Sequence, residues 1–207
     1  MSKEKETNTS SASPSTGASA AIFDYFEMFV FAAVTVILLM TFALRMCVVS
    51  GPSMNNTLLN GERLLVSDLF YTPKQGDIIV FHQTSEIDDR FNEPIVKRVI
   101  ATGGQFVKMD YANEKLYVSN DNSFTEDEVL NESDYAYFSN GKWGGSYSKG
   151  SSEVIYEVPE GHLFVLGDNR NVSADSRDER VGFVDERRVL GKVLVRLTPF
   201  SKFGKVG

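Results

Sequence analysis

The chain begins with a polar stretch and then turns sharply apolar. Residues 1–21 are mainly small and polar, and we expect a disordered tail there. From Met28 to Val49 the only charged residue is Arg45, which lies near one end of the run. As a helix, this run would be about 33 Å long, which matches the hydrocarbon core of a bilayer. The pattern therefore predicts a transmembrane anchor over residues 22–49.

A cleaved signal peptide is the main alternative for the apolar run, and a buried core helix is a second one. The apolar part of a signal peptide is shorter, about 7–15 residues, and follows a basic start. Here the start has mixed charge (Lys3, Glu4, Lys5 and Glu6) and lies far from the apolar run. The uncleaved anchor fits better. Basic residues flank the run on both sides, so they do not set its orientation.

Beyond the apolar run the pattern changes to short β-type runs separated by turn residues such as Gly76 and Gly167. Short strands without intervening helical periods indicate a mainly antiparallel β domain, which we place at residues 50–199. Residues 200–207 would form a C-terminal tail. The expected strands are Glu62–Ser67, Asp77–Phe81, Pro94–Ala101, Gln105–Asp110, Lys115–Ser119, Glu153–Val158, His162–Leu166 and Val189–Leu197.

The acidic excess of the chain is concentrated in one region. The 207 residues have a net charge of −7, and residues 121–160 alone contain nine acidic and two basic residues. Residues 120–152, which cover most of that region, lack periodicity, and we interpret them as an acidic surface insertion. Proteins that grip nucleic acid through its phosphates usually have a basic excess, so we expect no nucleic-acid partner.

Few residues are available for metal binding or disulfides. Cys47 is the single cysteine, which excludes an internal disulfide framework and a multi-cysteine zinc site. His82 and His162 are the only histidines and leave little for a histidine-based metal centre. We expect neither a metal nor an organic cofactor, and we expect both histidines to lie at strand ends.

Ser53 is the first candidate for chemistry, in the segment V-V-S-G-P-S-M-N-N-T-L. Gly51 and Pro52 before it favour a sharp turn, which can present the hydroxyl and the amide of Ser53 to a cleft. A serine acts as a nucleophile only when a base activates it. Taken alone, G-P-S is more typical of an ordinary turn.

Lys97 is the second candidate, in P-I-V-K-R-V-I-A. On a strand its side chain shares a face with Ile95 and Val99. If that face is buried, desolvation lowers the pKa of the lysine and yields a neutral amine that can accept a proton. Taken alone, the pattern is more typical of a surface lysine whose stem covers apolar neighbours.

The third candidate is the loop G-D-N-R-N-V-S-A-D-S-R at residues 167–177. It directly follows an apolar strand and is dense in polar and charged side chains of both signs. Such a loop at a strand end suits an active site, although a solvated loop has the same composition.

Together these segments resemble the bacterial type I signal peptidases, membrane-anchored serine proteases that remove signal peptides. The resemblance implies the β-rich fold of that family, with one transmembrane helix and the catalytic domain on the extracytoplasmic side of the membrane. It also implies cleavage of secretory pre-proteins after small residues of the Ala-x-Ala type. It rests on S-G-P-S-M-x-x-T-L at 50–58, G-D-I-I-V-F at 76–81, V-K-R-V-I at 96–100, the loop at 167–177, and G-F-V at 182–184.

The resemblance further implies roles for individual residues. Ser53 would be the nucleophile and Lys97 the general base, in the place that histidine takes in the eukaryotic-type relatives. Ser173 would hydrogen-bond the Lys97 amine and orient it. Asp175 and Arg177 would form a supporting ion pair.

Four further residues complete the implied site. Arg98, next to the base, would pair with Asp168 of the loop. Met54 follows the nucleophile as it does in the family, and the amide of Ser53 would be one oxyanion donor. Gly51 stands where some members have a serine that provides the second donor, so Ser50 or a water molecule could take that role.

Two other functions are compatible with parts of the pattern. A non-catalytic anchored β domain could bind partners through the acidic insertion, and it would not need Ser53 or Lys97. A self-cleaving serine–lysine repressor would need a DNA-binding region, which the acidic balance and the anchor do not support. Membrane lipid is an expected partner, and residues 69–71 (L-F-Y), with Leu64 and Leu65 nearby, could form an apolar patch against it or pack in the core.

Overall fold

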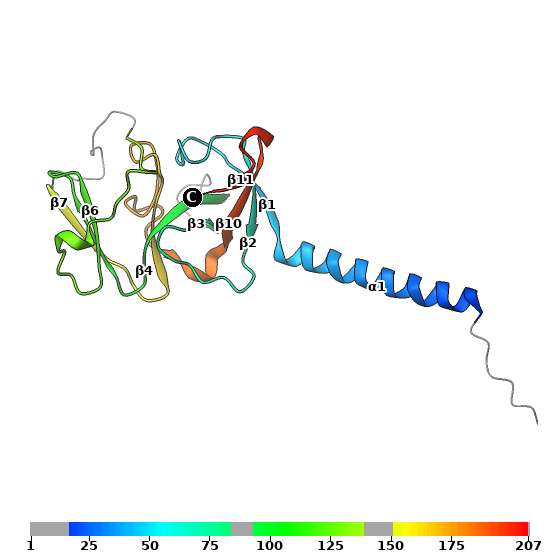
Figure 1. Cartoon of the computed structure of the whole chain (residues 1–207). Coiled ribbons are helices and arrows are strands. Elements are labelled where there is room, and N and C mark those ends of the chain that lie inside the picture. The colour runs from blue at the N-terminus through cyan, green and yellow to red at the C-terminus, as the bar shows by residue number, and fades with distance from the viewer. Residues whose placement is uncertain (1–16, 84–92, 139–150, 207) are drawn as a thin grey trace, which may run out of the picture. The chain divides into compact units, whose positions relative to one another are not determined.

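The computed structural model describes residues 17–83, 93–138 and 151–206 (Figure 1). It divides the chain into an N-terminal unit up to Phe42 and a β domain from Ala43 onward. Most of the predicted polar tail and residues 139–150 of the predicted insertion lie outside the described residues.

The N-terminal unit contains one helix, α1 (Ala18–Ala43). Its stretch Ala21–Leu38 is long and apolar enough to cross a membrane, and no residue of that stretch is buried. The predicted apolar helix was too long at its C-terminal end, because Arg45–Val48 form strand β1 and pair with β2 (Arg63–Ser67). A short apolar run can continue a helix or form a strand, so the change in structure was not visible in the sequence.

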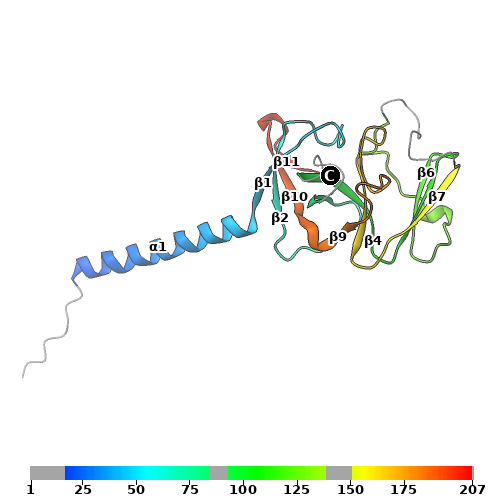
Figure 2. The same cartoon turned by 180° about the vertical axis from the view of Figure 1, so that it is seen from behind.

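The β domain consists of two antiparallel sheets (Figure 2). The large sheet has the order β1-β2-β10-β3-β4-β8-β9, with β11 added beside β10, and the small sheet has the order β6-β5-β7. Every strand predicted from the sequence is present, with ends that differ by at most one residue. The remaining bounds are β3 Ile78–His82, β4 Pro94–Thr102, β5 Phe106–Asp110, β6 Lys115–Ser119, β7 Glu153–Glu157, β8 His162–Leu166, β9 Val184–Asp185, β10 Val189–Thr198 and β11 Gly204–Lys205.

In the part of the chain that the structure describes, three short 3-10 helices lie between the strands: η2 (Glu126–Glu128), η4 (Glu186–Arg188) and η5 (Phe200–Lys202). The last of these corrects the predicted C-terminal tail. Residues 200–205 form η5 and β11, and Val206 is buried in the core. The segment is ordered because β11 adds hydrogen bonds to β10 while Val206 removes apolar surface from water.

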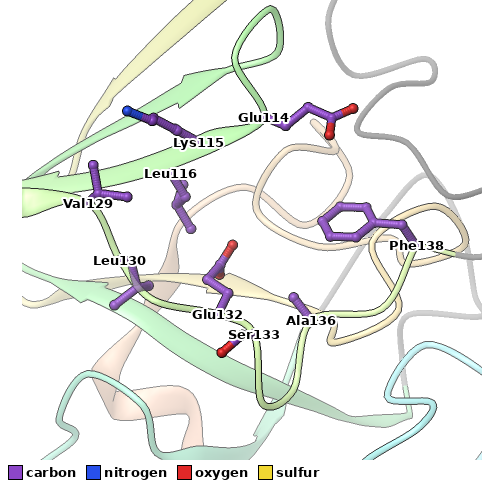
Figure 3. Close-up of a pocket in the computed structure, with 9 residues that line it drawn as sticks. All are labelled: Glu114, Lys115, Leu116, Val129, Leu130, Glu132, Ser133, Ala136 and Phe138. Carbon is purple, nitrogen blue, oxygen red and sulfur yellow. The ribbon is translucent and has the colours of Figure 1, made fainter. Parts of the chain in front are cut away.

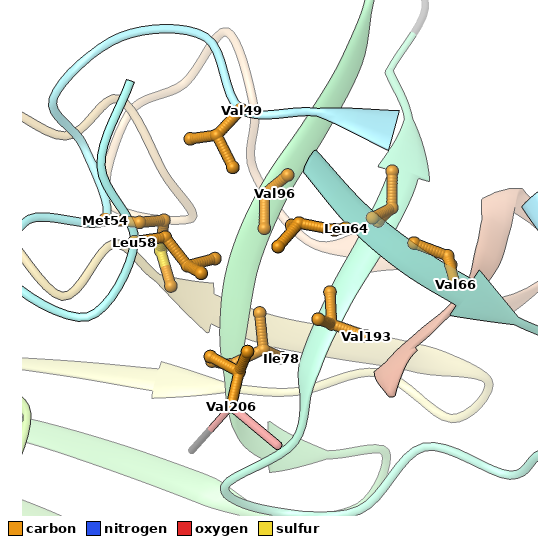
Figure 4. Close-up of a cluster of buried hydrophobic side chains, with 10 residues drawn as sticks. Val49, Met54, Leu58, Leu64, Val66, Ile78, Val96, Val193 and Val206 are labelled. Carbon is orange, nitrogen blue, oxygen red and sulfur yellow. The ribbon is translucent and has the colours of Figure 1, made fainter. Parts of the chain in front are cut away.

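One hydrophobic cluster fixes the segment that carries Ser53. Met54 and Leu58 follow the turn and point into the core (Figure 4), where their exposed fractions are 1% and 0%. The turn is therefore held from below by packing against the large sheet. The cluster consists of Val49, Met54, Leu58, Leu64, Val66, Ile78, Val80, Val96, Val193 and Val206.

The L-F-Y segment divides between surface and core. Phe70 is 99% exposed and Leu69 is exposed, whereas the Tyr71 hydroxyl donates to Asp77 Oδ2 at 2.8 Å and its ring packs against core residues. Leu64 belongs to the core. Leu65 is partly buried, so Leu69 and Phe70 are the exposed members of the predicted patch.

The packing predicts different effects for two leucines that lie close in sequence. Leu64→Ala should lower the free energy of unfolding by about 2–5 kcal/mol, because it leaves a cavity among buried side chains. Leu69→Ala, at an exposed site, should change it by less than about 0.5 kcal/mol. Denaturant unfolding of the detergent-solubilised chain, followed by circular dichroism, measures both. Equal effects of the two changes would contradict this assignment of the core.

Candidate active site

The turn that carries Ser53 connects β1 to the loop that precedes β2. Gly51 has a φ of +83°, a left-handed conformation that glycine adopts without strain. Its amide donates to Asn60 Oδ1 at 2.9 Å, which ties the two ends of the turn together. Ser53 is thereby held at the surface of the turn, above the buried side chain of Met54.

Lys97 reaches Ser53 from the middle of β4. Strand β4 lies between β3 and β8 in the large sheet, and Lys97 faces Ile79 of β3. The Lys97 Nζ lies 2.8 Å from Ser53 Oγ and 3.1 Å from the carbonyl oxygen of Val96. The structure therefore brings the predicted nucleophile and the predicted base into direct hydrogen-bond contact, although 44 positions separate them.

The environment of Lys97 favours the neutral amine. The residue is only 3% exposed, and burial lowers its pKa from 10.5 to about 8. Asp175 and Asp168 oppose this shift, and Arg177 adds to it. A substantial fraction of the amine is then unprotonated in mildly alkaline solution, as a general base requires.

Arg98, the next residue on β4, makes the predicted ion pair with Asp168. Its Nε and Nη2 each donate to one carboxylate oxygen of Asp168 at 2.8 Å, and its Nη1 donates to Gly76 O at 2.9 Å. Thr57, in the turn after Ser53, also donates to Asp168. This buried two-pronged pair links β4, the loop at 167–177 and the nucleophile turn.

Asp175 and Arg177 form the second predicted pair, again with two hydrogen bonds of 2.8 Å. Burial raises the pKa of Asp175, but the charge and hydrogen bonds of Arg177 outweigh it, so the pKa lies below its usual value. Hydrogen bonds from the Gly167 amide and from Ser173 act in the same direction. The predicted contact of Ser173 with the Lys97 amine stays a prediction.

Gly167 lies where three segments meet. A Cβ atom at this position would be 2.2 Å from Ser173 Oγ and 2.5 Å from the carbonyl oxygen of Ser53. That carbonyl accepts the Asn169 amide at 3.0 Å, and Asn169 Nδ2 donates to Pro52 O at 3.2 Å. The loop thus holds the backbone of the nucleophile turn directly, and only glycine fits at its closest approach.

A small pocket of about 130 Å³ opens beside the dyad. Within the described part of the chain, no protein acceptor takes the Ser53 amide, which can therefore face a substrate oxygen. A nucleophile, a base and an amide donor around a small pocket are the parts that acyl transfer needs. The pocket is lined by Val49, Ser50, Ser53, Met54, Glu93, Pro94, Ile95, Val96 and Lys97.

One feature of the site was missed by the sequence analysis. Residues 120–138 belong to the predicted surface insertion, but part of this stretch lies against the catalytic loop. Glu132 is only 9% exposed and pairs with Arg170, and the Tyr135 ring centre lies 4.0 Å from the Arg98 guanidinium carbon. The density of acidic residues suggested solvent exposure, and nothing in the local pattern singled out Glu132 as the partner of a buried arginine.

The histidines lie away from the dyad, at strand ends. His82 ends β3 and is exposed, and His162 begins β8 with its Nδ1 3.0 Å from Glu160 O. In residues 17–83, 93–138 and 151–206, no three His, Cys, Asp or Glu side chains are grouped so that they could hold a metal ion.

Comparisons with known proteins show which family the chain is similar to. The pattern of the family described as signal peptidase, peptidase S26, matches residues 22–198. Signal peptidase IB of Staphylococcus aureus is 35% identical over 167 residues, which cover 75% of this chain and 78% of the relative. A probable signal peptidase I-1 of a Synechocystis species is 31% identical over 182 residues, covering 85% and 82%.

A crystal structure of a signal peptidase I from Enterococcus faecalis is similar to 59% of this chain and covers 97% of that chain. Its identity is 30% and its TM-score 0.37. The family match over residues 22–198 and the identity to the two relatives establish the family of this chain. The chain belongs to the peptidase S26 family of signal peptidases, enzymes that cleave signal peptides from secreted proteins.

Proposed function

We propose that this signal peptidase uses Ser53 as nucleophile and Lys97 as general base. The observation that carries the proposal is the 2.8 Å contact between Ser53 Oγ and a lysine amine whose pKa burial lowers to about 8. The neutral amine takes the hydroxyl proton as Ser53 Oγ attacks the carbonyl carbon of the scissile peptide bond. No histidine is needed for this step, because one lysine can carry the proton in both directions.

The same amine completes the reaction. Protonated Lys97 gives its proton to the leaving amine, and the C–N bond breaks to leave an ester on Ser53. Neutral Lys97 then takes a proton from a water molecule, which attacks the ester. As the ester C–O bond breaks, protonated Lys97 returns that proton to Ser53 Oγ, and the signal peptide leaves with a free carboxyl group. Each half-reaction returns the lysine to the protonation state that the next one requires.

The amide of Ser53 would stabilise the negative oxygen that develops on the substrate carbonyl. The amide of Gly51 already donates to Asn60, so it does not offer itself as the second donor. Ser50 lines the same pocket as Ser53 and is the protein group that could complete the oxyanion hole.

The size of the pocket supports a preference for small residues before the cleavage point. Its volume of about 130 Å³ is well below that of pockets for larger ligands, and Ile95, Val96 and Met54 give it apolar walls. An alanine side chain fits such a space without polar partners. We therefore propose secretory pre-proteins with Ala-x-Ala-type cleavage sites as substrates.

We further propose that α1 anchors the enzyme as a single membrane span, with the β domain on the extracytoplasmic side. The apolar stretch Ala21–Leu38 supports the span, and the site of signal-peptide cleavage supports the side. Phe70 and Leu69, exposed on the β domain, suit contact with lipid.

The first prediction concerns the dyad. Ser53→Ala and Lys97→Ala should each abolish cleavage of a pre-protein in detergent, because each removes a group that forms or breaks a bond. Cleavage is followed by gel shift, with Ser67→Ala, in β2 away from the dyad, as the matched control. Activity in Ser53→Ala would refute the nucleophile, and activity in Lys97→Ala would move the role of base to another group.

The second prediction concerns pH. Because only the neutral amine accepts a proton, kcat/KM should rise about tenfold per pH unit below pH 8 and level off above it. Lys97→Arg should be inactive throughout, since a guanidinium stays charged at these pH values. A wild-type rate that is flat from pH 6 to pH 9, measured under single-turnover conditions, would contradict the assignment.

The third prediction concerns Gly167. Gly167→Ala should lower kcat about 100-fold, because its methyl group displaces Ser173 or the Ser53 backbone. Gly161→Ala is the control for backbone strain alone, because a Cβ there meets no atom within 4 Å although the φ of +70° disfavours alanine. If steady-state kinetics show both variants equally active, Gly167 does not fix the nucleophile turn.

A further inference from the structure

The segment from Val129 to Phe138 runs beside the catalytic loop and is bonded to its backbone. The Tyr137 amide donates to Asp168 O at 2.7 Å, and the Arg170 amide donates back to Tyr137 O at 2.9 Å. These bonds form a short parallel bridge between Tyr137 and Asn169. The loop that contacts Ser53 on one side is therefore paired with residues of the acidic region on its other side.

A buried ion pair reinforces this pairing. Arg170 is 2% exposed, and its Nη1 donates to Glu132 Oε2 at 2.6 Å while its Nη2 contacts Glu132 Oε1. Figure 3 shows Glu132 on the segment that faces β6, among residues lining a cavity of about 220 Å³. Because solvent does not screen this buried pair, Arg170 and Glu132 hold each other's side chains in place more firmly than a surface ion pair would.

We infer that Glu132 is a positioning residue for the nucleophile, acting through Arg170 and the backbone of the loop. Held by Glu132, Arg170 donates from Nε to Gly167 O at 3.1 Å and accepts at its carbonyl from Arg177 Nη2 at 2.8 Å. The bond from Arg170 to Gly167 O thus holds together the turn at residues 167–170. The Asn169 amide of this turn donates to the Ser53 carbonyl oxygen. The inference rests on the proposed role of Ser53.

The charges around Arg170 explain why a carboxylate is needed. Burial lowers the pKa of Arg170, but the charge and hydrogen bonds of Glu132 outweigh burial and raise it, whereas the nearby charge of Arg177 lowers it. Without Glu132, two arginine cations would lie close together in a buried site. Because a guanidinium does not lose its proton, Arg170 would have to turn toward solvent or compete for Asp175. Either movement releases the Gly167–Asn169 turn.

The same segment also contacts the other ion pair of the site. The ring of Tyr135 covers the Arg98 guanidinium, whose carbon lies 4.0 Å from the ring centre. Residues 132–137 thereby contact the loop directly at Asp168 and Arg170, and Tyr135 also reaches Asp168 through Arg98. This agrees with a role in holding the loop in one position.

The test compares Glu132→Gln with wild type as full-length protein in detergent, with a pre-protein substrate. We expect kcat to fall about 10- to 100-fold, with KM changed by less than about threefold, because the pocket beside Lys97 is built by other segments. The pH midpoint should stay near 8, since burial, the largest cause of the lowered Lys97 pKa, is unchanged. Glu132→Asp, which keeps the charge, should recover part of the lost rate.

A matched control and a second variant separate positioning from stability. Glu126→Gln removes a carboxylate of the same region whose partner, Lys115, is exposed, and it should leave kcat unchanged. Glu132→Gln combined with Arg170→Met removes both buried charges and should be more stable than Glu132→Gln alone, yet still slow, because the bond to Gly167 is lost.

Two results would overturn the inference. One is a folded Glu132→Gln enzyme with wild-type kcat, and the other is a loss of rate that follows the unfolded fraction in thermal melting. If Glu132→Gln does not fold, the double variant decides: wild-type kcat refutes positioning, and a low kcat in a folded protein supports it. Ser53→Ala is assayed alongside, and activity there would instead refute the proposed function.

Discussion

The amine of Lys97 is buried against a serine hydroxyl, and the rest of the site has to keep that amine able to lose its proton. Burial alone favours the neutral form, but Asp168 and Asp175 both lie near enough to favour the charged one. Each of these carboxylates is held by its own arginine through two hydrogen bonds. The ion pairs therefore do more than brace a loop, because they keep two negative charges from fixing the base in its protonated state.

Ser53, the proposed nucleophile, is held by two different kinds of force. From below, Met54 and Leu58 anchor the turn by apolar packing, which is strong but not directional. From the side, the Asn169 amide and the close approach of Gly167 fix the backbone of Ser53 by hydrogen bonding and contact. Together they determine both the depth and the orientation of the hydroxyl, which a single kind of contact could not do.

The strands of the β domain were predictable because alternation and turn residues are local signals. Strand β1 was missed because Met46 to Val48 read equally well as the end of an apolar helix. The pairing of Arg98 with Asp168 came from the family resemblance and not from any pattern along the chain. The crowding at Gly167 and the burial of Glu132 arise only when distant segments meet, so no local property of the sequence marks them.

Strand parity places Lys97 and Arg98 on opposite faces of β4, and each face has a different task. A slip of one position against β3, where Ile79 now faces Lys97, would exchange the two side chains. A permanent cation would then stand at the serine, and a titratable one would stand among the carboxylates of the loop. If Lys97 is the base, as proposed, the alignment of two neighbouring strands decides whether a proton acceptor or a permanent charge stands at Ser53. Errors of strand pairing during folding would then yield protein that is compact but inactive.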